Sequence, residues 1–143
     1  MTDEENVVST IQVEISAPER MPVQFEATQV TVPGGEGVFT VLPGHTPMLS
    51  TLGMGVLIAW DESGEARFFA INSGFAEVLD NRVVILATTA EGEQELDEDR
   101  ARAAMQRAQE RIRKPSDDTD IRRAEAALRR ALSRIEAKER KFY

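Results

Sequence analysis

The stretch RVVILATTAEGEQELDEDRARAAMQRA, residues 82–108, contains a change of hydrophobic period. Its first seven residues continue an alternating, β-branched pattern that begins upstream and is typical of strands. Further on, Ala101, Met105, Ala108 and Ile112 are spaced by four, three and four residues. That spacing places them on one face of a helix. The sequence therefore predicts a β part followed by an α part.

Upstream of this change, short alternating segments are separated by turn signals. The segments are STIQVEI (9–15), VQFEATQVTV (23–32), GVLIAW (55–60), ARFFAI (66–71), FAEVL (75–79) and RVVILAT (82–88). The turn signals are PGGEG (33–37), DESGE (61–65), NSG (72–74) and DN (80–81). The alternation changes phase near Thr28, which indicates a bulge or a strand break. Many short strands with closely spaced turns predict an antiparallel β-sandwich or barrel.

The α part reads as two helices joined by a short break. Pro115 ends the first helix, and Asp117, Asp118 and Thr119 supply N-cap and first-turn chemistry for the second. The apolar stripe of the second helix comprises Ile121, Ala124, Leu128, Ala131 or Leu132, and Ile135. Two such helices pack as an antiparallel hairpin. The alanine-rich seam buries little area, at roughly 25 cal/mol per Å². We therefore expect the hairpin to lean on the β part or on a partner, and to be able to open.

Composition restricts the chemistry available to the chain. Its 143 residues include one histidine and no cysteine, which excludes disulfides, thiolate nucleophiles and cysteine-based metal sites. We expect no metal site. The single histidine, His45, lies in VLPGHTPML (41–49), where two prolines and a glycine make a stiff loop. No nucleophile or second histidine accompanies it, so we expect a shape-holding docking loop and no catalytic residue.

The charge is unevenly distributed along the chain. The net charge is −8, which argues against an ordinary basic nucleic-acid binder. Residues 1–90 carry 12 acidic and 3 basic side chains, whereas residues 121–143 carry 3 acidic and 8 basic ones. A basic end on an acidic protein favours an acidic partner for that end, or a solvated helix face. No apolar run approaches the roughly 20 residues that span a bilayer, and no signal peptide is recognisable.

Four segments carry a family resemblance. GGEGVFTVLPGHTPMLSTLGMGVL (34–57) and SGFAEVLDNRVVILATTAE (73–91) resemble the central part of the epsilon subunit of rotary ATP synthases. LDEDRARAA (96–104) and DTDIRRAEAALRRALSRI (118–135) resemble its two C-terminal helices. The resemblance covers about residues 9–140 in the family's order. It implies an N-terminal antiparallel β-sandwich followed by a C-terminal antiparallel two-helix hairpin, and no catalytic centre.

The resemblance also implies a domain division and a function. The sandwich would span residues 9–90 and the hairpin residues 91–143, while residues 1–8 lie outside the resemblance and are expected to be a flexible, acidic extension. The chain would be a rotor subunit at the cytoplasmic face of the bacterial inner membrane, touching the membrane only through the complex. Its sandwich would dock on the gamma subunit and the c-ring to couple ion flow to ATP synthesis, and its hairpin would inhibit ATP hydrolysis. The implied docking loop comprises Glu36, Val38, Pro43, Gly44 and His45.

The basic face of the second helix has an implied partner, the catalytic beta subunit. The implied contact residues are Arg122, Arg123, Arg129, Arg130 and Arg134. Arg123, Arg130 and Arg134 are spaced by seven and four residues, so they share a helix face. The arginines could instead pair along the helix with Asp120, Glu125 and Glu136.

LDEDRA (96–101) matches the motif of family members that bind ATP in the folded hairpin. The implied nucleotide site comprises Glu91, Asp97, Arg100, Ala101, Arg130 and Arg134. Guanidinium groups hold phosphates through charge-assisted hydrogen bonds. ATP would be a regulatory ligand, and no cofactor is required. Asp97 could instead stabilise a helix N-terminus or form an ion pair with Arg100 within the helix. No segment of the sequence resembles a P-loop, so we expect no ATP hydrolysis by this chain. The alternative function is a free-standing ATP-sensing module, which would not co-purify with a rotary enzyme.

Overall fold

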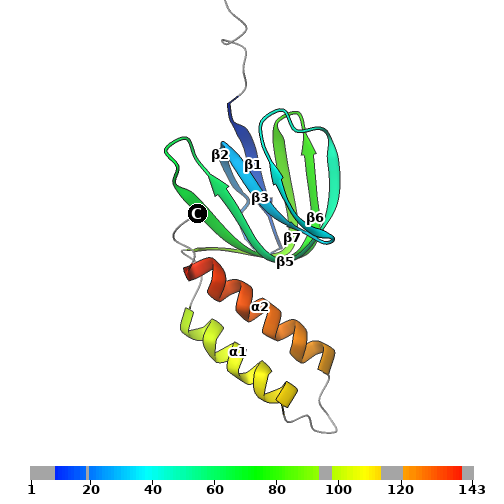
Figure 1. Ribbon diagram of the computed structural model, residues 1–143, viewed down its shortest axis with the longest axis vertical. Coiled ribbons are helices and arrows are strands. Elements are labelled where there is room, and N and C mark those ends of the chain that lie inside the picture. Colours follow the sequence, from blue (N-terminus) through cyan, green and yellow to red (C-terminus); the bar gives the residue numbers. More distant parts are fainter. Residues whose placement is uncertain (1–8, 19, 94–97, 114–120, 140–143) are drawn as a thin grey trace, which may run out of the picture.

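The computed structural model describes residues 9–18, 20–93, 98–113 and 121–139, in which seven strands precede two helices (Figure 1). The strands are β1 (Ile11–Ser16), β2 (Val23–Ala27), β3 (Gln29–Gly34), β4 (Gly37–Val41), β5 (Met48–Trp60), β6 (Ala66–Leu79) and β7 (Arg82–Gly92). The helices are α1 (Glu98–Arg113) and α2 (Ile121–Glu139). This order confirms the predicted β-sandwich followed by a helical hairpin.

The strands are hydrogen-bonded in the order β2-β1-β7-β6-β5-β3-β4. Every neighbouring pair is antiparallel except β1 and β7, which run parallel. This parallel pair departs from the wholly antiparallel sheet that the short turns predicted. Its register runs from Gln12 opposite Arg82 to Ser16 opposite Leu86. Beyond Leu86, therefore, β7 has β6 as its only strand neighbour among the described residues.

The core of the sandwich is built by the period of two that the sequence shows. In β1, Ile11, Val13 and Ile15 are at most 1% exposed, while the residues between them point outward or lie at the boundary. The buried residues packed with them all come from 11–90. Within the described chain, the sandwich thus encloses its main core without help from the helices.

The NSG segment (72–74) is not the turn that the sequence predicted. β6 continues through it, with Ser73 at φ 40° and Gly74 at φ 126°. A Cβ on Gly74 would lie 1.9 Å from the carbonyl oxygen of Leu86, so only glycine fits this close approach. The turn-forming residues therefore produce a local irregularity inside one long strand.

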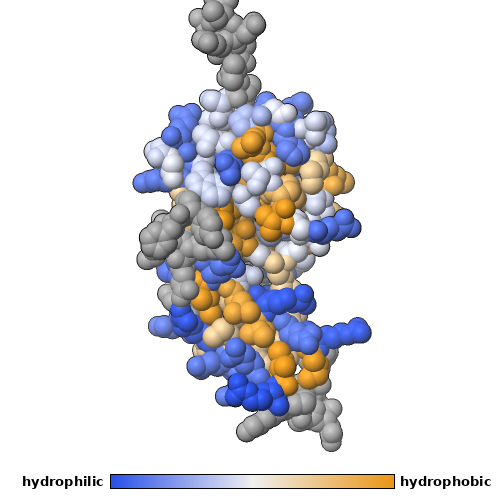
Figure 2. All heavy atoms as spheres, in the orientation of Figure 1, coloured by the Kyte–Doolittle hydropathy of each residue, from blue (hydrophilic) through white to orange (hydrophobic). Residues whose placement is uncertain are grey.

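The helices form the predicted antiparallel hairpin, with small residues at the seam (Figure 1). Ala101 and Ala108 of α1 and Ala124 and Ala131 of α2 are all at most 3% exposed. Leu132 is 45% exposed, so Ala131 is the member of the buried stripe. Figure 2 shows apolar residues running along the hairpin between hydrophilic flanks.

The hairpin leans on the sandwich through the last turns of α2. Ala137 is completely buried in a small cluster with Ile58, Phe68 and Ala70, which come from β5 and β6. The hairpin thus packs on the β part, which is one of the two supports that the sequence analysis expected. Because the helix contributes only an alanine to that cluster, the apolar contact is modest in size.

Candidate functional site

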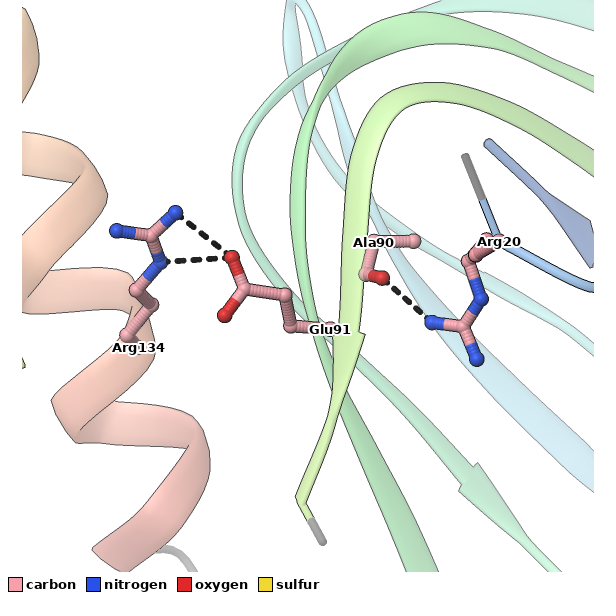
Figure 3. Close-up of polar contacts among 4 residues, drawn as sticks. All are labelled: Arg20, Ala90, Glu91 and Arg134. Atoms are coloured by element: carbon pink, nitrogen blue, oxygen red, sulfur yellow. Dashed lines mark hydrogen bonds and ion pairs between the residues drawn. The ribbon is translucent and has the colours of Figure 1, made fainter. Parts of the chain in front are cut away.

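A polar contact joins the hairpin to the end of β7 (Figure 3). Oε1 of Glu91 accepts a hydrogen bond from Nε of Arg134 at 2.9 Å and lies 2.7 Å from Nη2 of the same guanidinium in an ion pair. Nearby, Nζ of Lys138 donates to the carbonyl oxygen of Glu93 at 3.3 Å. Both side chains of the ion pair are about one-third exposed, so solvent screens their attraction in part. Together these contacts hold the C-terminal half of α2 beside the strand that leads into the hairpin.

A cavity of about 360 Å³ adjoins this contact. It is lined by Glu91, Arg100, Ala101, Ala103, Ala104, Arg107 and Arg134. The small side chains of the alanines leave room for the cavity. Its charged lining consists of three guanidinium groups and one carboxylate, so the cavity is polar and predominantly cationic. The volume lies within the range of roughly 300–1,000 Å³ that is usual for small-molecule pockets. The arrangement suits an anionic ligand of moderate size.

Most of the residues that the resemblance implied for a nucleotide site come together here. Glu91, Arg100, Ala101 and Arg134 line the cavity. Arg130 lines a smaller hollow of about 10 Å³, which adjoins the cavity because Glu91 and Arg134 line both. Asp97 lies outside the described residues. Arg107 was missed by the sequence reasoning, although its spacing of seven from Arg100 places both on one face of α1.

The five arginines predicted to meet a catalytic subunit do not share one environment. Arg122, Arg123 and Arg129 are exposed. Arg130 and Arg134 are half-buried and line the hollow beside the sandwich. The folded hairpin therefore presents only part of the predicted basic face to solvent.

The first segment of the predicted docking loop is the tip of the β3–β4 hairpin. Glu36 is exposed there, and Val38 is 71% exposed. The tip rests on β5, because the amide of Gly35 donates to the carbonyl of Thr51 at 2.8 Å. A Cβ on Gly35 would lie 2.2 Å from Oγ1 of Thr51, so any larger residue here would have to displace the side chain of Thr51.

The second segment holds Pro43, Gly44 and His45, and it is tied to the β6–β7 turn. The amide of Gly44, at φ 83°, donates to Oδ1 of Asn81 at 2.6 Å. The carbonyl of Asn81 also accepts from the amide of Gln12, near the start of β1. Figure 1 shows this start of β1 at the end of the sandwich away from the helices. His45 hydrogen-bonds through Nδ1 to the carbonyl of Thr46 at 2.6 Å, which is a contact within the loop.

The sequence reasoning missed a strip of exposed apolar residues on the outer face of β5, β6 and β7. Leu49, Phe75 and Leu86 are 72%, 55% and 53% exposed. The strand pairing places all three on one face of the sheet. Phe75 lies directly opposite Leu86, and Leu49 lies opposite Glu77. Because Glu77 is two residues from Phe75 along β6, the two side chains point to the same face. One signal in the sequence could have revealed it: in the alternating pattern of β7, Leu86 falls on the face opposite to Ile85, which is buried. We name Leu49, Phe75 and Leu86 the outer apolar strip.

The described residues hold no group of three or more histidine, aspartate or glutamate side chains placed to bind a metal. In the same part of the chain, no helix is long and apolar enough to cross a membrane. The described residues thus form a self-contained sandwich with a lightly docked helical arm, a cationic cavity and an outer apolar strip.

Comparisons with known proteins give the particular family. Residues 10–93 match the β-sandwich domain, and residues 94–139 the long α-helix domain, of the ATP synthase delta/epsilon chain. The chain therefore belongs to the ATP synthase delta/epsilon family. The ATP synthase epsilon chain of Desulforapulum autotrophicum is 44% identical over 129 residues, which cover 90% of this chain and 96% of the relative. That of Moorella thermoacetica is 40% identical over 130 residues, covering 91% and 97%.

A solved structure agrees with this assignment. A chain in the Euglena gracilis mitochondrial ATP synthase, solved as OSCP, F1 and c-ring in rotational state 1, superposes with a TM-score of 0.76. It is 25% identical, and the match covers 90% of this chain and 81% of that one.

Proposed function

We propose that this chain is a non-catalytic rotor subunit of a rotary ATP synthase, in which the sandwich docks and the hairpin regulates. Family membership over residues 10–139 supports the subunit role. The observation that carries the regulatory role is the contact between Arg134 and Glu91, which fastens a separable helical arm to the sandwich. The chain would act at the cytoplasmic face of a bacterial inner membrane, as a peripheral part of the complex.

Two surfaces of the sandwich support docking. The outer apolar strip exposes three apolar side chains that the described residues leave uncovered, and it would fit the gamma subunit. The β3–β4 tip and the loop around His45 carry exposed, rigidly seated backbone, and they fit the polar loops of the c-ring. These are the contacts that would couple ion translocation to ATP synthesis.

The folded hairpin represents the permissive state of the proposed regulator. Arg130 and Arg134 face the sandwich, so they cannot meet a catalytic beta subunit while α2 stays docked. Undocking would present them together with Arg122, Arg123 and Arg129 to acidic side chains on that subunit. Such a contact is steered by charge and weakened by salt. The extended hairpin would therefore be the state that inhibits ATP hydrolysis.

ATP is the proposed regulatory ligand of the cationic cavity. Arg100, Arg107 and Arg134 would bind the phosphates, and Glu91 would accept from a ribose hydroxyl or a base amino group. The cavity is lined by both the hairpin and β7, so it exists only in the docked arrangement. A ligand that binds only this arrangement stabilises it by mass action.

The role in the complex is tested on a catalytic head stripped of its own epsilon subunit. The full chain and a chain ending at residue 93 are compared for co-elution with the head and for the rate of ATP hydrolysis. We expect both to bind and only the full chain to slow hydrolysis. If neither binds to a head from the same source, a free-standing ATP-sensing module replaces the rotor subunit.

The nucleotide site is tested by calorimetric titration of the isolated chain with ATP. Arg107→Met is expected to weaken binding about tenfold, because it removes a charged partner of the phosphates. Arg111→Met is the matched control, since Arg111 is an exposed arginine on α1 that does not line the cavity. Equal affinities of the two variants would remove Arg107 from the site.

A further inference from the structure

A second arginine contacts the end of β7 from the side opposite to the hairpin. Arg20 lies on the connection between β1 and β2, and its Nη1 donates to the carbonyl oxygen of Ala90 at 2.5 Å. Figure 3 shows Arg20 and Arg134 on opposite sides of β7. The two arginines thus contact adjacent residues, Ala90 and Glu91, 70 and 43 positions away from them in the sequence.

The topology of the sheet explains why Arg20 is needed at this place. β1 pairs with β7 only as far as Leu86, and the chain then turns away towards β2. On that edge, the last residues of β7 have no neighbouring strand among the residues that the structure describes. Ala90 is 5% exposed, and a buried backbone carbonyl needs a hydrogen-bond donor. The guanidinium of Arg20 supplies that donor where the strand is missing.

This hydrogen bond fixes the backbone at the point from which the side chain of Glu91 departs. Successive side chains of a strand point to opposite faces, so Ala90 lies in the core and Glu91 faces α2. On its other edge this part of β7 is held by β6, where Ala90 lies opposite Ile71. With Arg20 in place, the peptide before Glu91 is held from both edges.

We propose that Arg20 is a positioning residue for Glu91, and through it a determinant of how firmly the hairpin docks. By holding the carbonyl of Ala90, Arg20 keeps the carboxylate of Glu91 where it accepts a hydrogen bond from Nε of Arg134 and forms an ion pair with that guanidinium. The connection between β1 and β2 is thereby linked to the position of α2. The consequence for ATP hydrolysis rests on the proposed function, whereas docking of the hairpin is a property of the isolated chain.

The test measures docking directly, without ATP or other subunits. The chain contains no cysteine, so two dye-labelled cysteines at the exposed positions Ser63 and Arg111 report the distance between sandwich and hairpin by energy transfer. We expect Arg20→Met to raise the undocked-to-docked ratio about fivefold. Arg20→Lys keeps a charged donor and is expected to recover part of the loss. Arg67→Met is the control, because Arg67 lines the same surface hollow as Arg20 but stands over the ring of Phe25.

A double-mutant comparison separates positioning from general stability. In a Glu91→Gln background the ion pair is already weakened, so Arg20→Met should add little further undocking. If Arg20→Met raises the undocked ratio by the same factor in both backgrounds, Arg20 does not act through Glu91 and the proposal is wrong. The urea midpoint of each variant is measured in parallel. Should Arg20→Met fail to fold, Arg20→Lys in the two backgrounds decides in the same way.

Discussion

Asn81 shows how one side chain can hold the shape of the loop around His45. Its Oδ1 accepts from the amide of Gly44, and its own φ of 59° is one that asparagine tolerates better than most residues. Asn81→Ala loses the acceptor and strains the turn, so we expect a loss of about 1–2 kcal/mol in the free energy of unfolding, measured with urea. Asn81→Asp keeps both features and should remain close to the parent. A parent-like Asn81→Ala would mean that the loop holds its shape without this contact.

Single residues also mark how much of the site could be predicted. Glu91, Arg100 and Arg134 were identified because their motif and order match a family pattern. Arg20 had no such signal, since its partner is a backbone carbonyl 70 positions away and any residue type supplies a carbonyl. Phe75 was overlooked because an exposed aromatic residue in a strand has the same composition signal as a buried one.

Within the strands, Gly74 is expected to be intolerant of any side chain. Gly74→Ala would bring its Cβ against the carbonyl of Leu86, so we expect a loss of about 3 kcal/mol in unfolding free energy. Gly64→Ala is the matched control, because Gly64 also has a positive φ, 86°, but open space around it. Gly64→Ala should lower the free energy of unfolding by only about 1–2 kcal/mol. Similar losses for the two variants would show that the clash in β6 is relieved by relaxation.

The docking of α2 depends on the smallness of Ala137. Ala137→Leu would place a larger side chain in a completely buried site, so we expect it to weaken docking by about 1–3 kcal/mol. Energy transfer between labels on sandwich and hairpin should show the undocking, while the sandwich keeps its urea midpoint. Glu125→Leu, at an exposed position of α2, should leave docking unchanged. An unaltered distance in Ala137→Leu would mean that the cluster with Ile58 and Phe68 can expand.

At the level of elements, local sequence patterns predicted where most strands and helices lie, but they did not predict which strands pair with each other. Alternation located most strands, and the phase change at Thr28 corresponds to the break between β2 and β3. The segment 72–74 was predicted as a turn because Asn, Ser and Gly are the same residues that make bulges. The parallel pairing of β1 with β7 joins segments about 70 residues apart, and alternation within each strand carries no information about its neighbour.

The whole molecule separates into one part with a complete core and one part without. Among the described residues, the whole main core lies within 11–90, and the hairpin adds only Ala137 to a second small cluster. We therefore expect a chain ending at residue 93 to unfold cooperatively at nearly the same urea concentration as the full chain. Its far-ultraviolet circular dichroism should lose the helical signal and keep the strand signal. A strongly lowered midpoint would show that the helices stabilise the sandwich itself.

The small cluster under Ala137 has a consequence for solubility. When α2 leaves, the side chains of Ile58, Phe68 and Ala70 lose their cover and add a second apolar patch to the outer apolar strip. Exposed patches of this kind promote self-association. An undocked molecule free in solution would therefore be prone to aggregate, unless another protein surface took the place of the helix. While it stays docked, the hairpin therefore shields this patch from self-association.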